Sequence, residues 1–114
     1  MDEKVLKYLT DVARSIDHIE EFCASRPKMF QVFCEDVFFK SAIQWEIAVI
    51  GEAMNRILKI EPDIAITSAR RIVNTRNYLI HGYDSLRDDI IWSIVINHIP
   101  LLKSEVSCIL ASAD

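Results

Sequence analysis

An arginine and a histidine that stand five residues apart are the residues of this sequence best suited to chemistry on a phosphate. They are Arg76 and His81, and residues 76 to 83 read RNYLIHGY. The planar guanidinium of Arg76 matches a phosphate, and the imidazole of His81 titrates near neutral pH and can serve as acid or base. Metal-free RNA cleavage needs a base for the attacking 2′-hydroxyl, an acid for the leaving oxygen and a cation near phosphorus.

The spacing of the two residues sets a geometric condition on such a site. Five residues along an ideal helix give a rotation of about 500°, so Arg76 and His81 would point roughly 140° apart in an unbroken helix. They converge only if His81 lies at the frayed helix end, where Gly82 lets the backbone turn away because glycine takes positive φ without steric cost. The macrodipole at a helix C-terminus favours a protonated imidazole, which suits the acid role. Asn77 can orient the histidine or bind a phosphate oxygen.

The same residues also have ordinary structural explanations. Arg76 could form a surface ion pair, Gly82 could cap the helix, and His81 could satisfy carbonyl groups at the helix end, where histidine is common. The chemistry alone favours these structural roles. One motif histidine per chain is also awkward for a reaction that needs both an acid and a base. Two chains that pair their His81 residues across an interface would solve that difficulty.

The apolar pattern predicts four principal helices that must position these residues. They cover residues 3–22, 35–59, 66–80 and a last stretch from about residue 86, in which Pro100 removes one backbone hydrogen bond and so kinks or splits the helix. The sequence has only two glycines and three prolines, too few for the many turns of an all-β fold. We therefore predict an all-α fold, an up-and-down antiparallel bundle, as a single domain over residues 1–114.

The predicted second helix is apolar on almost its whole circumference, so most of its sides must be covered. A partner subunit is the preferred cover, which predicts a homodimer, and a central helix wrapped by its own chain is the alternative. Glu52 lies inside this helix and needs a partner for its carboxylate. Arg76 of the same or of the other chain is a candidate, and such a pair would hold the arginine in place.

Composition limits the possible partners. The formal charge is −4 and the pI is near 5.3, which argues against a general nucleic-acid coat protein, so any RNA contact requires a local basic surface. The three cysteines form no Cys-x-x-Cys pair, and the N-terminus resembles neither a signal peptide nor a membrane span. We expect a cytoplasmic protein with no membrane contact, no metal and no cofactor. His18 and Glu21 lie one turn apart, but a surface polar pair is a better explanation than a metal site.

The motif resembles the R-N-x-x-x-H-x-Y signature of HepT-like toxins in the HEPN superfamily. Further segments resemble the same family: IGEA at residues 50–53, Tyr83-Asp84, Ile91-Trp92, and IPLL at residues 99–102. The resemblance spans about residues 35–102. It implies a HEPN-like dimer of helical bundles and a metal-independent ribonuclease with a composite site at the dimer interface.

The resemblance also implies roles for particular residues. Arg76 and His81 would be catalytic, and Asn77 would assist them. Tyr83 would accept AMP from a cognate minimal nucleotidyltransferase of the MntA type, the antitoxin, and the added bulk and negative charge would block RNA. Tyr83 would otherwise pack over the loop. The alternative function is a non-catalytic substrate-binding subunit of a minimal nucleotidyltransferase, and a helical interaction module with a vestigial motif is a third possibility.

Overall fold

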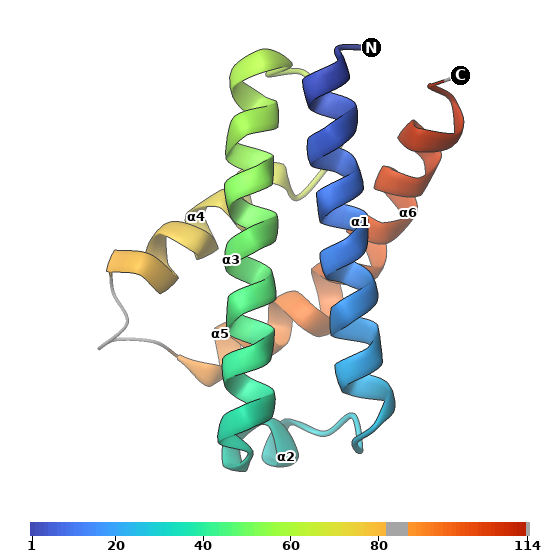
Figure 1. Ribbon diagram of the computed structural model, residues 1–114. Coiled ribbons are helices and arrows are strands. Elements are labelled where there is room, and N and C mark those ends of the chain that lie inside the picture. The colour runs from blue at the N-terminus through green and yellow to red at the C-terminus, as the bar shows by residue number, and fades with distance from the viewer. Residues whose placement is uncertain (82–86, 114) are drawn as a thin grey trace.

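The computed structural model describes residues 1–81 and 87–113, and it describes only the backbone of residues 80 and 81. All regular structure within these residues is helical, which confirms the all-α prediction (Figure 1). The elements are α1 (Glu3–Ala24), α2 (Phe30–Glu35), α3 (Val37–Ile60), α4 (Ala69–His81), α5 (Asp88–Ser93), the π-helical segment η2 (Ile94–His98) and α6 (Ile99–Ala111).

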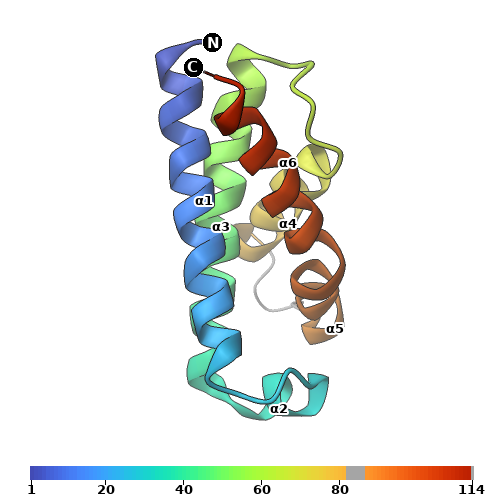
Figure 2. The ribbon, with the colours of Figure 1, turned by 90° about the vertical axis from the view of Figure 1, so that its right-hand side faces the viewer.

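The two long helices α1 and α3 run antiparallel and side by side, and α4 crosses α3 obliquely (Figures 1 and 2). The α5–η2–α6 run lies against α1 on the side where α4 is also found (Figure 2). Helix α3 is central because it packs against both α1 and α4. Its fully buried side chains include Phe39, Ile43, Ile47, Ile50, Met54 and Ile57. The chain itself therefore covers much of the apolar circumference that was expected to require a partner subunit.

The start of α3 differs from the predicted start at residue 35, because a separate short helix, α2, ends there. Asp36 has an extended backbone between the two helices, and its carboxylate accepts a hydrogen bond of 3.0 Å from the Phe39 amide. Arg26 Nε donates to the same carboxylate at 3.1 Å. The Phe39 amide, followed by Arg26, lowers the pKa of Asp36. The apolar pattern runs through both helices, so it did not reveal the break between them.

Helix α4 begins at Ala69, three residues after the predicted start near residue 66. The Thr67 amide instead donates to both carboxylate oxygens of Glu105 in α6, each at 3.1 Å, and the Thr67 hydroxyl donates to the same carboxylate at 2.9 Å. This contact joins residues 38 positions apart. A tertiary contact of this kind is invisible to local periodicity, which explains the misplaced boundary.

Pro100 has the predicted effect on the last helical run, which is divided into α5, η2 and α6. The π segment ends just before Pro100, and the Ile99 amide bonds to the Ile94 carbonyl five residues earlier. Because Pro100 has no N–H, the carbonyl four residues before it loses its usual donor, and a wider turn adjusts the backbone there.

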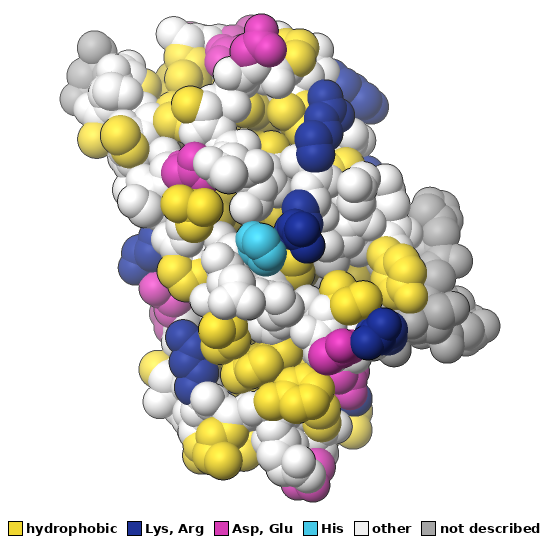
Figure 3. Space-filling model, turned by 180° about the vertical axis from the view of Figure 1, so that it is seen from behind, with side chains coloured by type: hydrophobic (Ala, Val, Ile, Leu, Met, Phe, Trp, Pro, Cys, Tyr) yellow, Lys and Arg dark blue, Asp and Glu magenta, His cyan; other side chains and the backbone are white. Residues whose placement is uncertain are grey.

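The same run, Asp88–Ala111, is the one helix among the described residues that is long and apolar enough to cross a membrane, by length and composition alone. In the fold, 28% of the apolar window is buried. Its inward residues Ile91, Ile94, Val95, Ile99, Leu102 and Val106 join the core. Hydrophobic side chains also gather on the lower half of the face seen from behind (Figure 3).

Candidate active site

The site begins with a close contact between α3 and α4 at Gly51. A β-carbon added at Gly51 would overlap the Cβ of Arg76 and would lie 2.8 Å from its Cγ and 3.1 Å from the Ile72 carbonyl oxygen. Gly51 is buried, and the space beside it is already filled by the stem of the arginine. The glycine is needed here for close approach of two helices, and it has no positive φ.

Glu52, the next residue of α3, holds the head of the same arginine. Its Oε2 lies 3.0 Å from Arg76 Nη2, and its Oε1 accepts a hydrogen bond of 3.0 Å from Arg56 Nε. The predicted pairing of Glu52 with Arg76 is therefore confirmed, within one chain. Hydrogen bonding to Tyr8, followed by that to Glu52, raises the pKa of Arg56. One carboxylate thus binds two arginines from two different helices.

Arg76 is held more firmly than a surface arginine would be. Only 14% of its side chain is exposed, against 55% for Arg56. Its Nε is buried and has no hydrogen-bond partner among the residues that the structure describes. A guanidinium in this setting has lost much of its rotamer freedom before any ligand arrives, and such preorganisation favours binding of a phosphate in one geometry.

The other residues of the motif are described only in part. Asn77 is exposed on α4, and His81 is the last residue of α4 that the structure describes. The side chain of His81 lies outside the described residues, as do Gly82 and Tyr83. Convergence of Arg76 with His81, the turn at Gly82 and the role of Tyr83 therefore remain predictions.

A pair formed by a histidine and a carboxylate, on α1 and α3, was not predicted from the sequence. His18 Nδ1 lies 3.0 Å from Glu46 Oε2, and Glu46 is only 7% exposed. Local spacing along the sequence suggested only Glu21 as a neighbour of His18. Glu46 stands 28 residues away on α3, so no local spacing pointed to the pair. A polar residue inside an apolar helix was the one available signal.

His98 lies in a separate place, on η2. Its Nδ1 is 3.2 Å from the Ser68 hydroxyl, and burial, with a smaller effect of Arg71, lowers its pKa. The side chain of His98 is partly buried. Within the described residues, no group of three or more His, Cys, Asp or Glu side chains could hold a metal ion.

Comparison with known proteins identifies the kind of protein to which this site belongs. The family described as ribonuclease HepT-like matches residues 12–109. A probable ribonuclease HepT of Thermococcus cleftensis is 32% identical over 102 residues, which cover 86% of this chain and 88% of the relative. A putative RNase of Methanocaldococcus jannaschii is 29% identical over 100 residues, covering 84% and 78% of the two chains.

A further relative from Methanocaldococcus jannaschii is a gamma-glutamylcyclotransferase and putative RNase. It is 27% identical over 115 residues, which cover 100% of this chain but only 51% of that longer protein. No solved structure matches the chain. The helical fold and these relatives define the class of the protein, a helical endoribonuclease. The chain belongs to the HepT-like ribonuclease family.

Proposed function

We propose that this chain is a metal-independent endoribonuclease toxin of a toxin–antitoxin pair, with its site built from Arg76, Asn77 and His81. The observation that carries the proposal is the arginine itself. Its stem packs on Gly51, its head is held by Glu52 at 3.0 Å, and it stands five residues before the end of α4 at His81. A surface ion pair would not require a buried glycine beneath it.

The proposed chemistry is an attack by the ribose 2′-hydroxyl on the adjacent phosphorus. A base takes the proton of the hydroxyl, the new bond from O2′ to phosphorus forms, and the bond from phosphorus to the 5′-oxygen breaks. An acid gives the leaving oxygen its proton, and Arg76 stabilises the negative charge on the phosphoryl oxygens. His81 supplies the acid or the base, and Asn77 orients the histidine or a phosphate oxygen.

The proposal includes a homodimer, because one motif histidine per chain cannot be base and acid at the same time. Two copies would bring two His81 side chains to one composite site. The proposed antitoxin is a minimal nucleotidyltransferase that transfers AMP to the Tyr83 hydroxyl, two residues beyond the histidine. The added phosphate would repel an RNA phosphate from the same place.

The experiment is cleavage of total cellular RNA with EDTA present, by the wild type and by His81→Ala and Arg76→Ala. Arg70→Ala is the matched control, since it removes an exposed arginine from the same helix. We expect cleavage by the wild type and the control and a loss of about a hundredfold or more in the other two. Circular dichroism and sedimentation must show that all four proteins fold and associate alike.

Two results would contradict the proposal. If all four proteins cut RNA equally, a contaminant or another site is responsible. If the wild type with unmodified Tyr83 is inert, the binding-subunit function becomes the better explanation, and binding to a nucleotidyltransferase should then be measured.

A further inference from the structure

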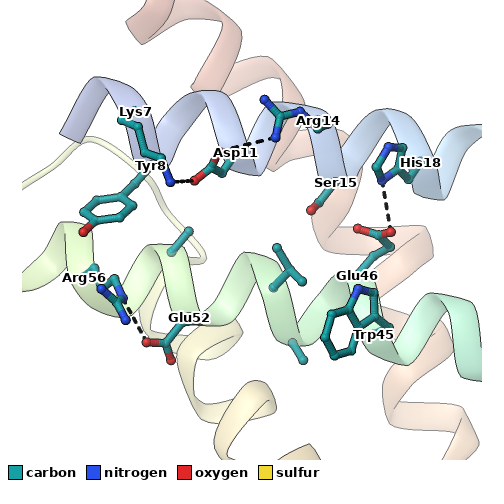
Figure 4. A pocket seen from close by; sticks show the side chains of 13 residues that line it. Lys7, Tyr8, Asp11, Arg14, Ser15, His18, Trp45, Glu46, Glu52 and Arg56 are labelled. Carbon is teal, nitrogen blue, oxygen red and sulfur yellow. Dashed lines mark hydrogen bonds and ion pairs between the residues drawn. The ribbon is translucent and has the colours of Figure 1, made fainter. Parts of the chain in front are cut away.

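A groove between α1 and α3 lies beside the candidate active site and has no part in the chemistry proposed above. It has a volume of about 820 Å³ (Figure 4). Glu52 lines one part of it, and Trp45, Glu46 and His18 line another. Glu52 also binds Arg76, so one residue connects the groove with the proposed catalytic arginine.

The His18–Glu46 pair gives the groove a defined hydrogen-bonding group. The contact of 3.0 Å between Glu46 Oε2 and His18 Nδ1 occupies that ring nitrogen. The other ring nitrogen, Nε2, belongs to a half-exposed side chain and can form a hydrogen bond with a ligand. A buried carboxylate bonded to one ring nitrogen in this way orients the ring for a ligand.

Trp45 gives the same part of the groove a flat apolar surface. Its side chain is 67% exposed, although an indole buries a large area when it joins a core. Figure 4 shows Trp45 next to Glu46 on α3, below the His18 ring. An exposed aromatic ring beside a hydrogen-bonding side chain is an arrangement with which proteins bind an unstacked nucleobase.

The charged residues along the groove are unusual for this acidic chain. Asp11 binds two cations, Lys7 at 2.7 Å and Arg14 at 3.7 Å. Glu52 likewise binds two, Arg56 and Arg76, each at 3.0 Å. The lining of the groove therefore carries three cations, Lys7, Arg14 and Arg56, and three carboxylates, so this surface is balanced in charge whereas the whole chain carries −4. A groove without net negative charge repels the phosphates of a strand less than the rest of this acidic chain would.

The spacing along α3 agrees with a strand that reaches the catalytic arginine. Trp45 and Glu52 are seven residues apart, which is two helical turns on the same face and a distance of roughly 10 Å. A distance of this size can be spanned by a strand of a few nucleotides, with one base on Trp45 and a phosphate near Arg76.

We propose that the groove binds the single-stranded RNA next to the scissile phosphate, with one base stacked on Trp45. His18 Nε2 forms a hydrogen bond with that nucleotide, and Lys7 and Arg14 lie near its phosphates. The inference rests on the proposed nuclease, because it assigns the groove to the substrate of that site. It names the substrate class as single-stranded RNA.

The test measures RNA binding separately from cleavage. The probe is a fluorescein-labelled, single-stranded oligoadenylate of about a dozen nucleotides, added to the full chain in EDTA on a His81→Ala background. In that background, Trp45→Ala should weaken binding roughly tenfold, and Trp45→Phe should keep most of it, because loss of one base–aromatic stack has about this effect. Phe38→Ala is the matched control, since Phe38 is 84% exposed on the same helix and lies outside the groove.

Three results would overturn the inference. Trp45→Ala could bind the oligonucleotide as tightly as its parent does. It could convert a dimer into a monomer in sedimentation, which would make the groove a contact between copies. Excess AMP could compete on equal terms with the oligonucleotide, which would define a site for a free nucleotide and not for a strand.

The two proposals fail in different ways. If oligonucleotide binding depends on Trp45 but the wild type does not cleave RNA, the RNA-binding role of the groove is supported and the nuclease proposal is contradicted. If RNA cleavage depends on His81 but oligonucleotide binding is unchanged by Trp45→Ala, the nuclease proposal is supported and the RNA-binding role of the groove is overturned.

Discussion

Glu52 Oε2 in α3 lies 3.0 Å from Arg76 Nη2 in α4, directly after the glycine on which the arginine stem packs. This pair joins the only two helices among the described residues that contribute to the candidate active site. The carboxylate therefore acts as a positioning residue. It touches the arginine, and the arginine is the group proposed to touch the phosphate.

Glu52→Gln should lower the cleavage rate more than it lowers RNA affinity. The amide has the shape of the carboxylate but no charge, so Arg76 is held less firmly, and misplacement of a catalytic group reduces kcat, here by about tenfold. RNA affinity should stay the same or rise, because one negative charge is removed from the groove. Single-turnover cleavage and oligonucleotide binding measure the two effects. Equal losses in both would instead indicate general damage to the site.

Gly51→Ala should destabilise the protein and reduce cleavage together. The new methyl group would overlap the Arg76 Cβ, which is fixed to the backbone, so α3 and α4 must move apart. Overpacking of this kind costs about 1–3 kcal/mol. Urea unfolding measures the loss of stability. Lys59→Ala, at an exposed position of the same helix, is the control and should unfold close to the wild type. An unchanged midpoint for Gly51→Ala would mean that the helices have more room than this contact indicates.

Asp36→Asn should remove a stabilising contribution that depends on pH. The Phe39 amide and Arg26 lower the pKa of Asp36 below its usual 3.8 in the folded state. Its contribution is therefore present above the unfolded pKa and is lost as the pH falls through the lower folded pKa. Urea unfolding at about pH 7 should show the variant to be less stable, and the difference should shrink at about pH 3. A difference that stays constant with pH would exclude the charge as its cause.

His98→Gln should remove a pH dependence of the folding stability that lies at higher pH than the one caused by Asp36. Burial, and then the charge of Arg71, lowers the pKa of His98 below 6.5 in the folded state, so the fold favours the neutral ring. That contribution is present above about pH 6.5 and is lost as the pH falls through the folded pKa. The wild type should therefore lose stability relative to the variant between about pH 7.5 and pH 5. Parallel stability curves for the two proteins over this range would contradict the prediction.

The sequence by itself determined the class of fold and where in the chain the proposed site lies. Scarce glycine and proline and the three-and-four spacing of apolar residues predicted the helices, because a helix buries a stripe that repeats with its own turn. Pro100 predicted the break in the last helix, since a missing N–H acts locally. The motif around Arg76 and His81 could be located because its residues are close in the chain. The residues between Gly82 and Leu86, Tyr83 among them, lie outside the described residues, and their roles remain sequence predictions.

Only the tertiary structure decided which distant residues meet. It placed Arg76 on Gly51, chose Glu52 of the same chain as its partner, and brought His18 to Glu46 across 28 residues. It also showed that α1 and α4 cover much of α3, for which apolar content alone had left both a partner subunit and the chain itself as possible covers. The physical reason is that side-chain periodicity reports which face of a helix is buried. The helix that covers that face, and the polar groups it brings, are fixed by the packing of the whole chain.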